Sequence, residues 1–77
     1  MLTKNNLNRI KVVLVEKHRT SKWLATQLGK GETTISKWCT NTTQPSLENL
    51  FKIACCLNVE ITELINKRPS DMVKKGD

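Results

Sequence analysis

The chain has 77 residues, which is near the lower limit of what one hydrophobic core can stabilise, so little room remains for an enzyme cleft. Its 13 Lys and Arg against 7 Asp and Glu give a formal charge of +6. Residues 1–45 hold eight basic and two acidic side chains, whereas residues 46–77 hold five of each. This local positive field favours a polyanion such as nucleic acid or an acidic membrane surface, with an ordinary soluble surface as the alternative.

Three cysteines and one histidine form no recognisable site. Cys39, Cys55 and Cys56 include no C-x-x-C pair, and His18 lies 21 residues from the nearest of them. Neither a zinc site nor a disulfide framework fits, and no nucleophile can be paired with a base, so we expect no metal, no cofactor and no enzymatic activity. The apolar run Val12–Val15 is too short to cross a bilayer, and we expect no leader at the start of the chain. We therefore expect a cytoplasmic, reduced protein that makes no membrane contact.

The first predicted helix runs from Asn6 to about His18, because apolar residues recur there at helical spacing. Thr3 or Asn5 would cap its start. Its predicted inward stripe consists of Leu7, Ile10, Val13 and Leu14.

Two short helices joined by Gly-Lys-Gly follow. Thr20 or Ser21 offers an N-cap for an eight-residue helix that ends at Gly29, and Gly31 opens a third helix over about 32–40. The next five residues, Asn-Thr-Thr-Gln-Pro, are typical of a loop. Small and apolar residues stand where two helices that cross at a tight turn would touch, although an ordinary helical hairpin is the alternative. The predicted core of this motif is Leu24, Ala25, Gly29, Ile35 and Trp38.

Two further helices complete the predicted fold. Ser46 caps the fourth, whose end is marked by Asn58, and residues 59–65 make a short fifth helix. Because no sustained period-two alternation occurs, we predict an all-α fold of five short helices around one core, a domain over 1–65 and a flexible tail over 66–77. The predicted inward residues of the fourth helix are Leu47, Leu50, Phe51, Ile53, Ala54 and Leu57.

Residues 19–65, together with the first helix, resemble the Cro and C1 repressor-type helix-turn-helix family of bacterial and phage regulators, also called the xenobiotic-response-element family. The motifs that carry the resemblance are WLATQLG for the first motif helix, TTISKW for the second, and QPSLENLFKIACCLNV with ITELI for the closing helices. The resemblance implies a compact, lambda-repressor-like DNA-binding domain, commonly a homodimer on a near-palindromic operator. It also implies a dimer surface on the fifth helix and tail, with Val59, Ile61, Leu64 and Ile65 as candidate contacts.

Two positions depart from the family pattern. The Gln that often stands near the start of the first motif helix is replaced by Ser21, and the Glu that usually follows the last core residue of the second is replaced by Cys39. Phosphate anchoring would therefore rest more on Thr20, Lys22 and the loop 41–43.

The outward face of the third helix follows from setting Ile35 and Trp38 inward. In the DNA-bound arrangement of this motif the second helix lies in the major groove, so this face would meet base edges. Lysine suits guanine, the threonine methyl suits thymine and serine suits either base, whereas Glu32 would accept from cytosine or only favour the helix N-terminus. The predicted base contacts are Glu32, Thr33, Ser36, Lys37 and Thr40, with a solvated face as the alternative.

Phosphate contacts are expected from side chains that flank the groove, unless these are only caps and loop residues without a ligand. Arg9 and Lys11 on the first helix are expected to form an ordinary solvated face. The predicted phosphate contacts are Thr20, Ser21, Lys22, Lys30, Asn41, Thr42 and Thr43.

The sequence thus predicts a sequence-specific regulator of transcription that binds double-stranded DNA, most simply a repressor that occupies an operator as a homodimer. The alternative is an antitoxin or other protein-interaction module that masks a protein partner. The basic first half favours DNA over a fold used only as an adaptor.

Overall fold

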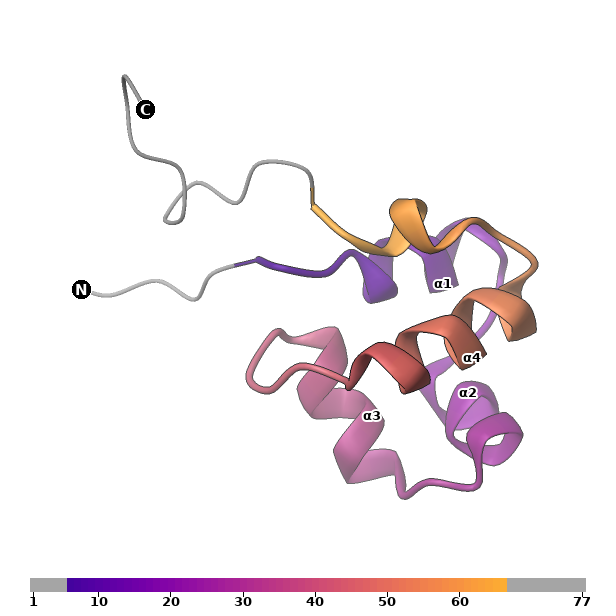
Figure 1. Cartoon of the computed structure of the whole chain (residues 1–77). Helices are drawn as coiled ribbons and strands as arrows, with labels where there is room; N and C mark the ends of the chain where they lie inside the picture. Colours follow the sequence, from indigo (N-terminus) through magenta and orange to yellow (C-terminus); the bar gives the residue numbers. More distant parts are fainter. Residues whose placement is uncertain (1–5, 67–77) are drawn as a thin grey trace.

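The computed structural model describes residues 6–66, which form four α-helices and one short 3-10 helix. α2 packs against α3 and α4, α1 against α3 and η1, and α4 against η1 (Figure 1). The all-α prediction is confirmed for this part of the chain, where the only β pairing is an isolated antiparallel bridge between Asn8 and Ile65. The elements are α1 Ile10–Glu16, α2 Ser21–Leu28, α3 Glu32–Cys39, α4 Leu47–Leu57 and η1 Ile61–Leu64.

Every helix contributes one apolar face to a single hydrophobic core, because each short helix gains most of its stability from burying an apolar stripe. The predicted motif core is confirmed at its four side chains, Leu24, Ala25, Ile35 and Trp38, which are all buried. The buried residues of this core are Ile10, Val13, Leu14, Leu24, Ala25, Ile35, Trp38, Ile53, Ala54, Leu57 and Leu64.

α1 begins at Ile10 and not at Asn6, so the predicted start was wrong. The cause is Asn8, whose side-chain Oδ1 accepts the backbone N–H of Ile10 at 3.0 Å and whose backbone pairs with Ile65. An asparagine that bonds the backbone two residues ahead holds the chain out of the helix. The predicted caps Thr3 and Asn5 lie outside the described residues.

The predicted fifth helix is a single 3-10 turn, Ile61–Leu64. Glu60 and Glu63 close a reciprocal capping box around it, in which the Glu63 carboxylate accepts the Glu60 N–H at 3.1 Å. Ile65 is already extended, because the backbone of this segment pairs with the N-terminal segment: Arg9 N–H donates to the Leu64 carbonyl at 2.8 Å. Pairing with distant backbone therefore replaces a longer helix.

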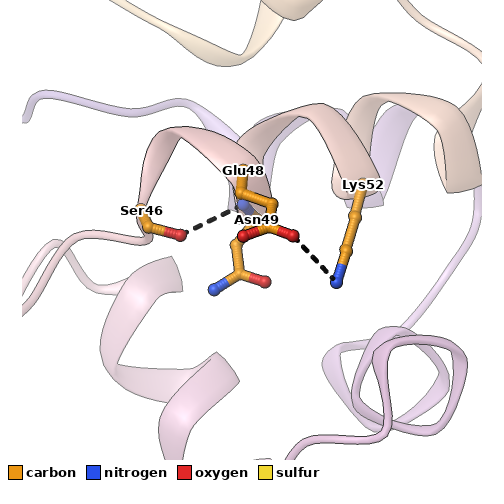
Figure 2. Close-up of polar contacts among 4 residues, drawn as sticks. All are labelled: Ser46, Glu48, Asn49 and Lys52. Atoms are coloured by element: carbon orange, nitrogen blue, oxygen red, sulfur yellow. Dashed lines mark hydrogen bonds and ion pairs between the residues drawn. The ribbon is translucent and has the colours of Figure 1, made fainter.

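α4 has the predicted caps. The Ser46 hydroxyl accepts the Asn49 N–H at 3.2 Å (Figure 2), and Asn58 ends the helix in the left-handed conformation. The predicted inward face was too wide, because Leu47 is 64% exposed and Phe51 53% exposed. The rest of the core fully covers only Ile53, Ala54 and Leu57, and Leu50 is partly buried against it.

The predicted tail, 66–77, lies outside the described residues except for Asn66. The N–H of Asn66 donates to the Leu7 carbonyl at 3.0 Å, so the described part of the chain ends beside its own beginning (Figure 1).

Candidate nucleic-acid interface

A tight turn sets the angle between α2 and α3. Thr20 caps α2, its hydroxyl accepting the Trp23 N–H at 3.0 Å, as predicted. Gly29 ends α2 with φ 67°, and the next N–H, that of Lys30, donates to the Ala25 carbonyl at 3.0 Å. A Cβ at Gly29 would meet no atom within 4 Å, so the left-handed φ and not the available space requires glycine.

α3 has two chemically different faces. Ile35 is fully buried and Trp38 is 5% exposed, which fixes the inward side of the helix. All five predicted base-contact residues, Glu32, Thr33, Ser36, Lys37 and Thr40, are exposed. The outward face is therefore small, polar and available to a groove, as a reading helix requires.

Thr40 and Thr42 form a hydroxyl pair at the end of α3. Their Oγ1 atoms are 2.8 Å apart, and the Thr40 hydroxyl also lies 3.1 Å from the Ser36 carbonyl. Thr40 is the C-cap of α3, and its hydroxyl lies within hydrogen-bond distance of the Ser36 and Lys37 carbonyls, which hold the side chain in place. Because a hydroxyl has two acceptor lone pairs besides its one donor, the Thr40 hydroxyl retains capacity to accept from a base or a bound water.

A surface hollow of about 220 Å³ joins α1, the start of α2 and α3. It brings Ser21 together with Ser36 and Thr40, and it adds the cations Lys11 and Arg19 to the same surface. Predicted phosphate and base contacts thus become neighbours of two basic residues that were not on the predicted list. The sequence indicated these two residues only weakly as part of a site, because Lys11 is one of several polar residues on α1 and Arg19 lies between two helices.

Trp23 holds Arg19 in place. The Arg19 guanidinium carbon lies 4.6 Å from the centroid of the Trp23 ring, a cation–π contact. Trp23 is half-buried and packs against the core, so the ring is a fixed support for the charge. Less conformational entropy is lost when a charge that is already positioned meets a phosphate.

The loop after α3 is tied to the N-terminal segment by a partly buried amide network. The Asn41 side chain accepts the Asn8 N–H at 3.0 Å and donates to the Asn8 carbonyl at 3.2 Å. Asn8, only 6% exposed, donates in turn to the Trp38 carbonyl at 2.9 Å and to the Gln44 side chain at 2.7 Å. Asn41 was predicted to contact phosphate, but in this structure its amide holds the loop in position.

The remaining predicted phosphate contacts are distributed around α3. Thr20, Lys22, Lys30, Thr42 and Thr43 are exposed, and Ser21 is half-buried at the first position of α2. The N–H groups at the start of a helix, together with its positive dipole end, favour an anion there. Residues 6–45 carry seven basic and two acidic side chains, so the field around this surface is positive.

Cys39, where the family usually has Glu, lies half-buried on the wall of the same hollow. Burial raises the pKa of its thiol above the ordinary value, while the positive charge of Lys11 acts in the opposite direction. The thiol is therefore neutral near pH 7, and it leaves the Lys11 charge unneutralised. Among the described residues no group of three or more His, Cys, Asp or Glu could hold a metal ion.

The four predicted dimer contacts do not share one surface. Leu64 is fully buried in the chain's own core, so its side chain is not available to a partner and that assignment was wrong. Ile65 is 38% exposed, and Val59 and Ile61 are half-buried against the core.

Comparisons with known proteins agree with this geometry. A family model described as helix-turn-helix matches residues 10–64. The crystal structure of a protein from Bacteroides fragilis, described as a candidate DNA-binding protein, is similar with 63% identity and a TM-score of 0.77, over 78% of this chain and 97% of that chain. A search of curated proteins finds no match. No helix in the described part of the chain is long and apolar enough to cross a membrane.

Proposed function

Because the chain belongs to the Cro/C1-type helix-turn-helix family, we propose that it is a transcriptional regulator that binds double-stranded DNA in a sequence-specific manner. The observation that carries the proposal is the outer face of α3, which exposes small polar side chains and one lysine beside the hollow that holds Lys11 and Arg19. Such a surface combines groups that read bases with cations that neutralise phosphates.

In the proposed complex α3 lies in the major groove. Lys37 donates to guanine O6 and N7, the Thr33 methyl contacts a thymine methyl, and Ser36 bonds a base of either kind. Glu32 stands in the first turn of α3, where its charge is favoured by the helix dipole and where it can accept from cytosine N4.

Phosphate groups on either side of the groove fix the register of the domain. The phosphates of one DNA strand lie at the start of α2. Thr20 and Ser21 offer them hydroxyls there, and Arg19 and Lys11 offer positive charge. The loop after α3, positioned by the Asn8–Asn41 network, meets the next phosphates with Thr42 and Thr43. These contacts position the protein without reading the sequence.

The proposed biological role is repression, exerted by a homodimer that occupies an operator and thereby blocks polymerase. The likeness to the candidate DNA-binding protein from Bacteroides fragilis supports the DNA-binding part of this proposal.

Selection from random-sequence duplexes at two salt concentrations tests the proposal. We expect an inverted repeat whose half-sites are spaced by about one helical turn, roughly 34 Å. The affinity for the selected site should exceed that for a shuffled duplex at both salt concentrations. Binding that falls steeply with salt and yields no motif would show only phosphate attraction and would overturn sequence-specific regulation.

A further inference from the structure

Near its end, α4 carries two adjacent cysteines whose chemistry the proposed function does not use. Cys55 is exposed, and Cys56 is half-buried against the core. The third cysteine, Cys39, lies on α3 and lines the hollow that holds Lys11 and Arg19. All three are free thiols. The chain therefore has a thiol pair at one place and a single thiol at another, and the two can be compared.

A hollow between α4 and the end of α2 has both thiols of the pair in its wall. Its volume is about 480 Å³, and it is lined by Gln27, Leu28, Phe51, Lys52, Cys55 and Cys56. Consecutive residues of an α-helix project about 100° apart, because one turn takes about 3.6 residues. Since both cysteines line the hollow, it lies over the arc between them, and a ligand inside it can contact both side chains.

The rest of this wall is mostly apolar. Leu28 is partly buried against the core, and Phe51, 53% exposed, lines the hollow with the two cysteines. The Lys52 ammonium is paired with the Glu48 carboxylate, with 3.8 Å between Nζ and the oxygen (Figure 2). Its charge is balanced within α4, so it does not make the hollow a site for an anion. A neutral, apolar ligand that bonds to sulfur suits these surroundings.

The protonation of the pair restricts the kind of ligand further. Burial raises the pKa of the Cys56 thiol above its ordinary value, and the neighbouring Cys55 acts in the same direction. The Cys56 thiol is therefore protonated near pH 7. A protonated thiol is a poor nucleophile and a poor ligand for a metal cation, because both reactions need the thiolate. A ligand that takes up the thiol proton as it binds avoids this limit.

Two thiols at adjacent helix positions cannot form a disulfide without breaking the helix. An S–S bond is about 2.05 Å long and needs Cβ atoms roughly 3.5–4.5 Å apart, whereas consecutive side chains of a helix diverge. A structural zinc site needs four ligands, and in the described part of the chain no third His, Cys, Asp or Glu joins the pair to hold a metal. An atom that bridges two sulfurs and carries its own third substituent meets neither obstacle.

We propose that Cys55 and Cys56 form a dithiol site for a monosubstituted trivalent arsenical, R–As(OH)₂, whose organic group R lies against Phe51 and Leu28. In the binding step two As–O bonds and two S–H bonds break, two As–S bonds form, and two water molecules leave. Each thiol proton leaves with a hydroxide, so the neutral thiols react without a separate base. Arsenic remains trivalent and neither sulfur is oxidised, so no oxidant or reductant is needed. The site is separate from the surface proposed to bind DNA, and the inference does not depend on that proposal.

Intact-protein mass spectrometry of the reduced full chain, titrated with phenylarsine oxide, tests the proposal; this probe hydrates to R–As(OH)₂ in water. We expect one phenylarsine group per wild-type chain, and a thiol assay on the adduct should find one free thiol in place of three. Cys55→Ser and Cys56→Ser should each raise the dissociation constant by on the order of 100-fold, because a single As–S bond lacks the second, intramolecular one. Cys39→Ser is the matched control and should bind as wild type does.

A methyl arsenical, compared with the phenyl one, tests where the organic group lies. Phe51→Ala should keep the two-thiol stoichiometry with both compounds. It should weaken binding of the phenyl compound more than that of the methyl compound, because an aromatic substituent loses the larger contact with the ring.

Binding to folded Cys55→Ser or Cys56→Ser that is as tight as binding to wild type overturns the proposal, and so does loss of binding in Cys39→Ser alone. An equal loss for both arsenicals in Phe51→Ala overturns the placement of the organic group. Circular dichroism shows whether each variant is folded, and Cys56→Ala provides a second test if Cys56→Ser misfolds. Half-site binding by the unmodified chain is measured separately, so it reports on the proposed function alone.

Discussion

α3 and α4 contribute to the same core but present opposite chemistry to solvent. On α3 the exposed residues include Thr33, Ser36 and Lys37, and the helix lies in the half of the chain that carries the positive excess. On α4 they include Leu47 and Phe51, and the nearby charges cancel within the helix. The inward stripes therefore determine how the helices pack, while the outward faces determine what each helix can bind.

The largest expected effect comes from replacing, one at a time, two adjacent residues that lie on opposite faces of α3. Ile35→Ala should lower the free energy of unfolding by about 2–5 kcal/mol, because it leaves a cavity at a fully buried position. Ser36→Ala should change it by less than about 0.5 kcal/mol. Urea denaturation followed by circular dichroism measures both. Equal losses would mean that the outer face of α3 is structural and not reserved for a ligand.

The second prediction compares one lysine from each helix. Lys37→Ala should weaken half-site binding by about 1–3 kcal/mol and relax one base position in each half-site, because a bidentate contact to guanine is lost. Lys52→Ala removes the same charge from α4 and should leave half-site affinity unchanged. Fluorescence anisotropy with the selected site and its single-base variants measures this difference. If Lys52→Ala weakens binding as much as Lys37→Ala, net charge explains the affinity and α3 does not read the sequence.

The third prediction concerns the left-handed residues that end α2 and α4. Gly29→Ala should cost about 1–2 kcal/mol of unfolding free energy, because φ is 67° there and an alanine Cβ is strained in that region. Asn58→Gly, at φ 58°, should cost nothing or stabilise slightly, since glycine adopts this conformation freely. Thermal unfolding of the two variants gives the comparison. A stable Gly29→Ala protein would show that the turn between α2 and α3 can rearrange.

Features that depend on near neighbours in the sequence could be predicted. Thr20 and Ser46 act through N–H groups three residues ahead, and Gly29 and Asn58 end their helices through their own backbone conformation. The outward face of α3 could be predicted equally well, because it follows from helical periodicity once Ile35 and Trp38 are placed inward.

Features that depend on residues distant in the sequence could not be predicted. The Asn8 side chain bonds the Ile10 N–H at the start of α1, but its conformation is also fixed by bonds to Asn41 and Gln44 and by pairing with Ile65, which is extended for the same reason. Periodicity identifies an apolar arc but does not show how much of it the rest of the core covers, so the exposure of Phe51 was missed.

The same limit applies to the site. Lys11 and Arg19 line the same hollow as Ser36 only because α1, the start of α2 and α3 surround it, and nothing in the sequence fixes how α1 is rotated against α3. The register of packed helices is set by side-chain interdigitation over the whole interface.

The smallest expected effect concerns two helix N-caps. One of them only stabilises its helix, and the other also lies at the proposed DNA surface. Thr20→Ala and Ser46→Ala each remove a hydroxyl that accepts one N–H at the start of a helix, so each should cost about 1 kcal/mol of unfolding free energy. Only Thr20→Ala should also weaken half-site binding, because its hydroxyl faces a phosphate in the proposed complex whereas Ser46 caps α4. Binding measured well below both unfolding transitions keeps the two effects apart. Equal half-site affinities for the two variants would remove Thr20 from the phosphate contacts and leave it the purely structural role that Ser46 has.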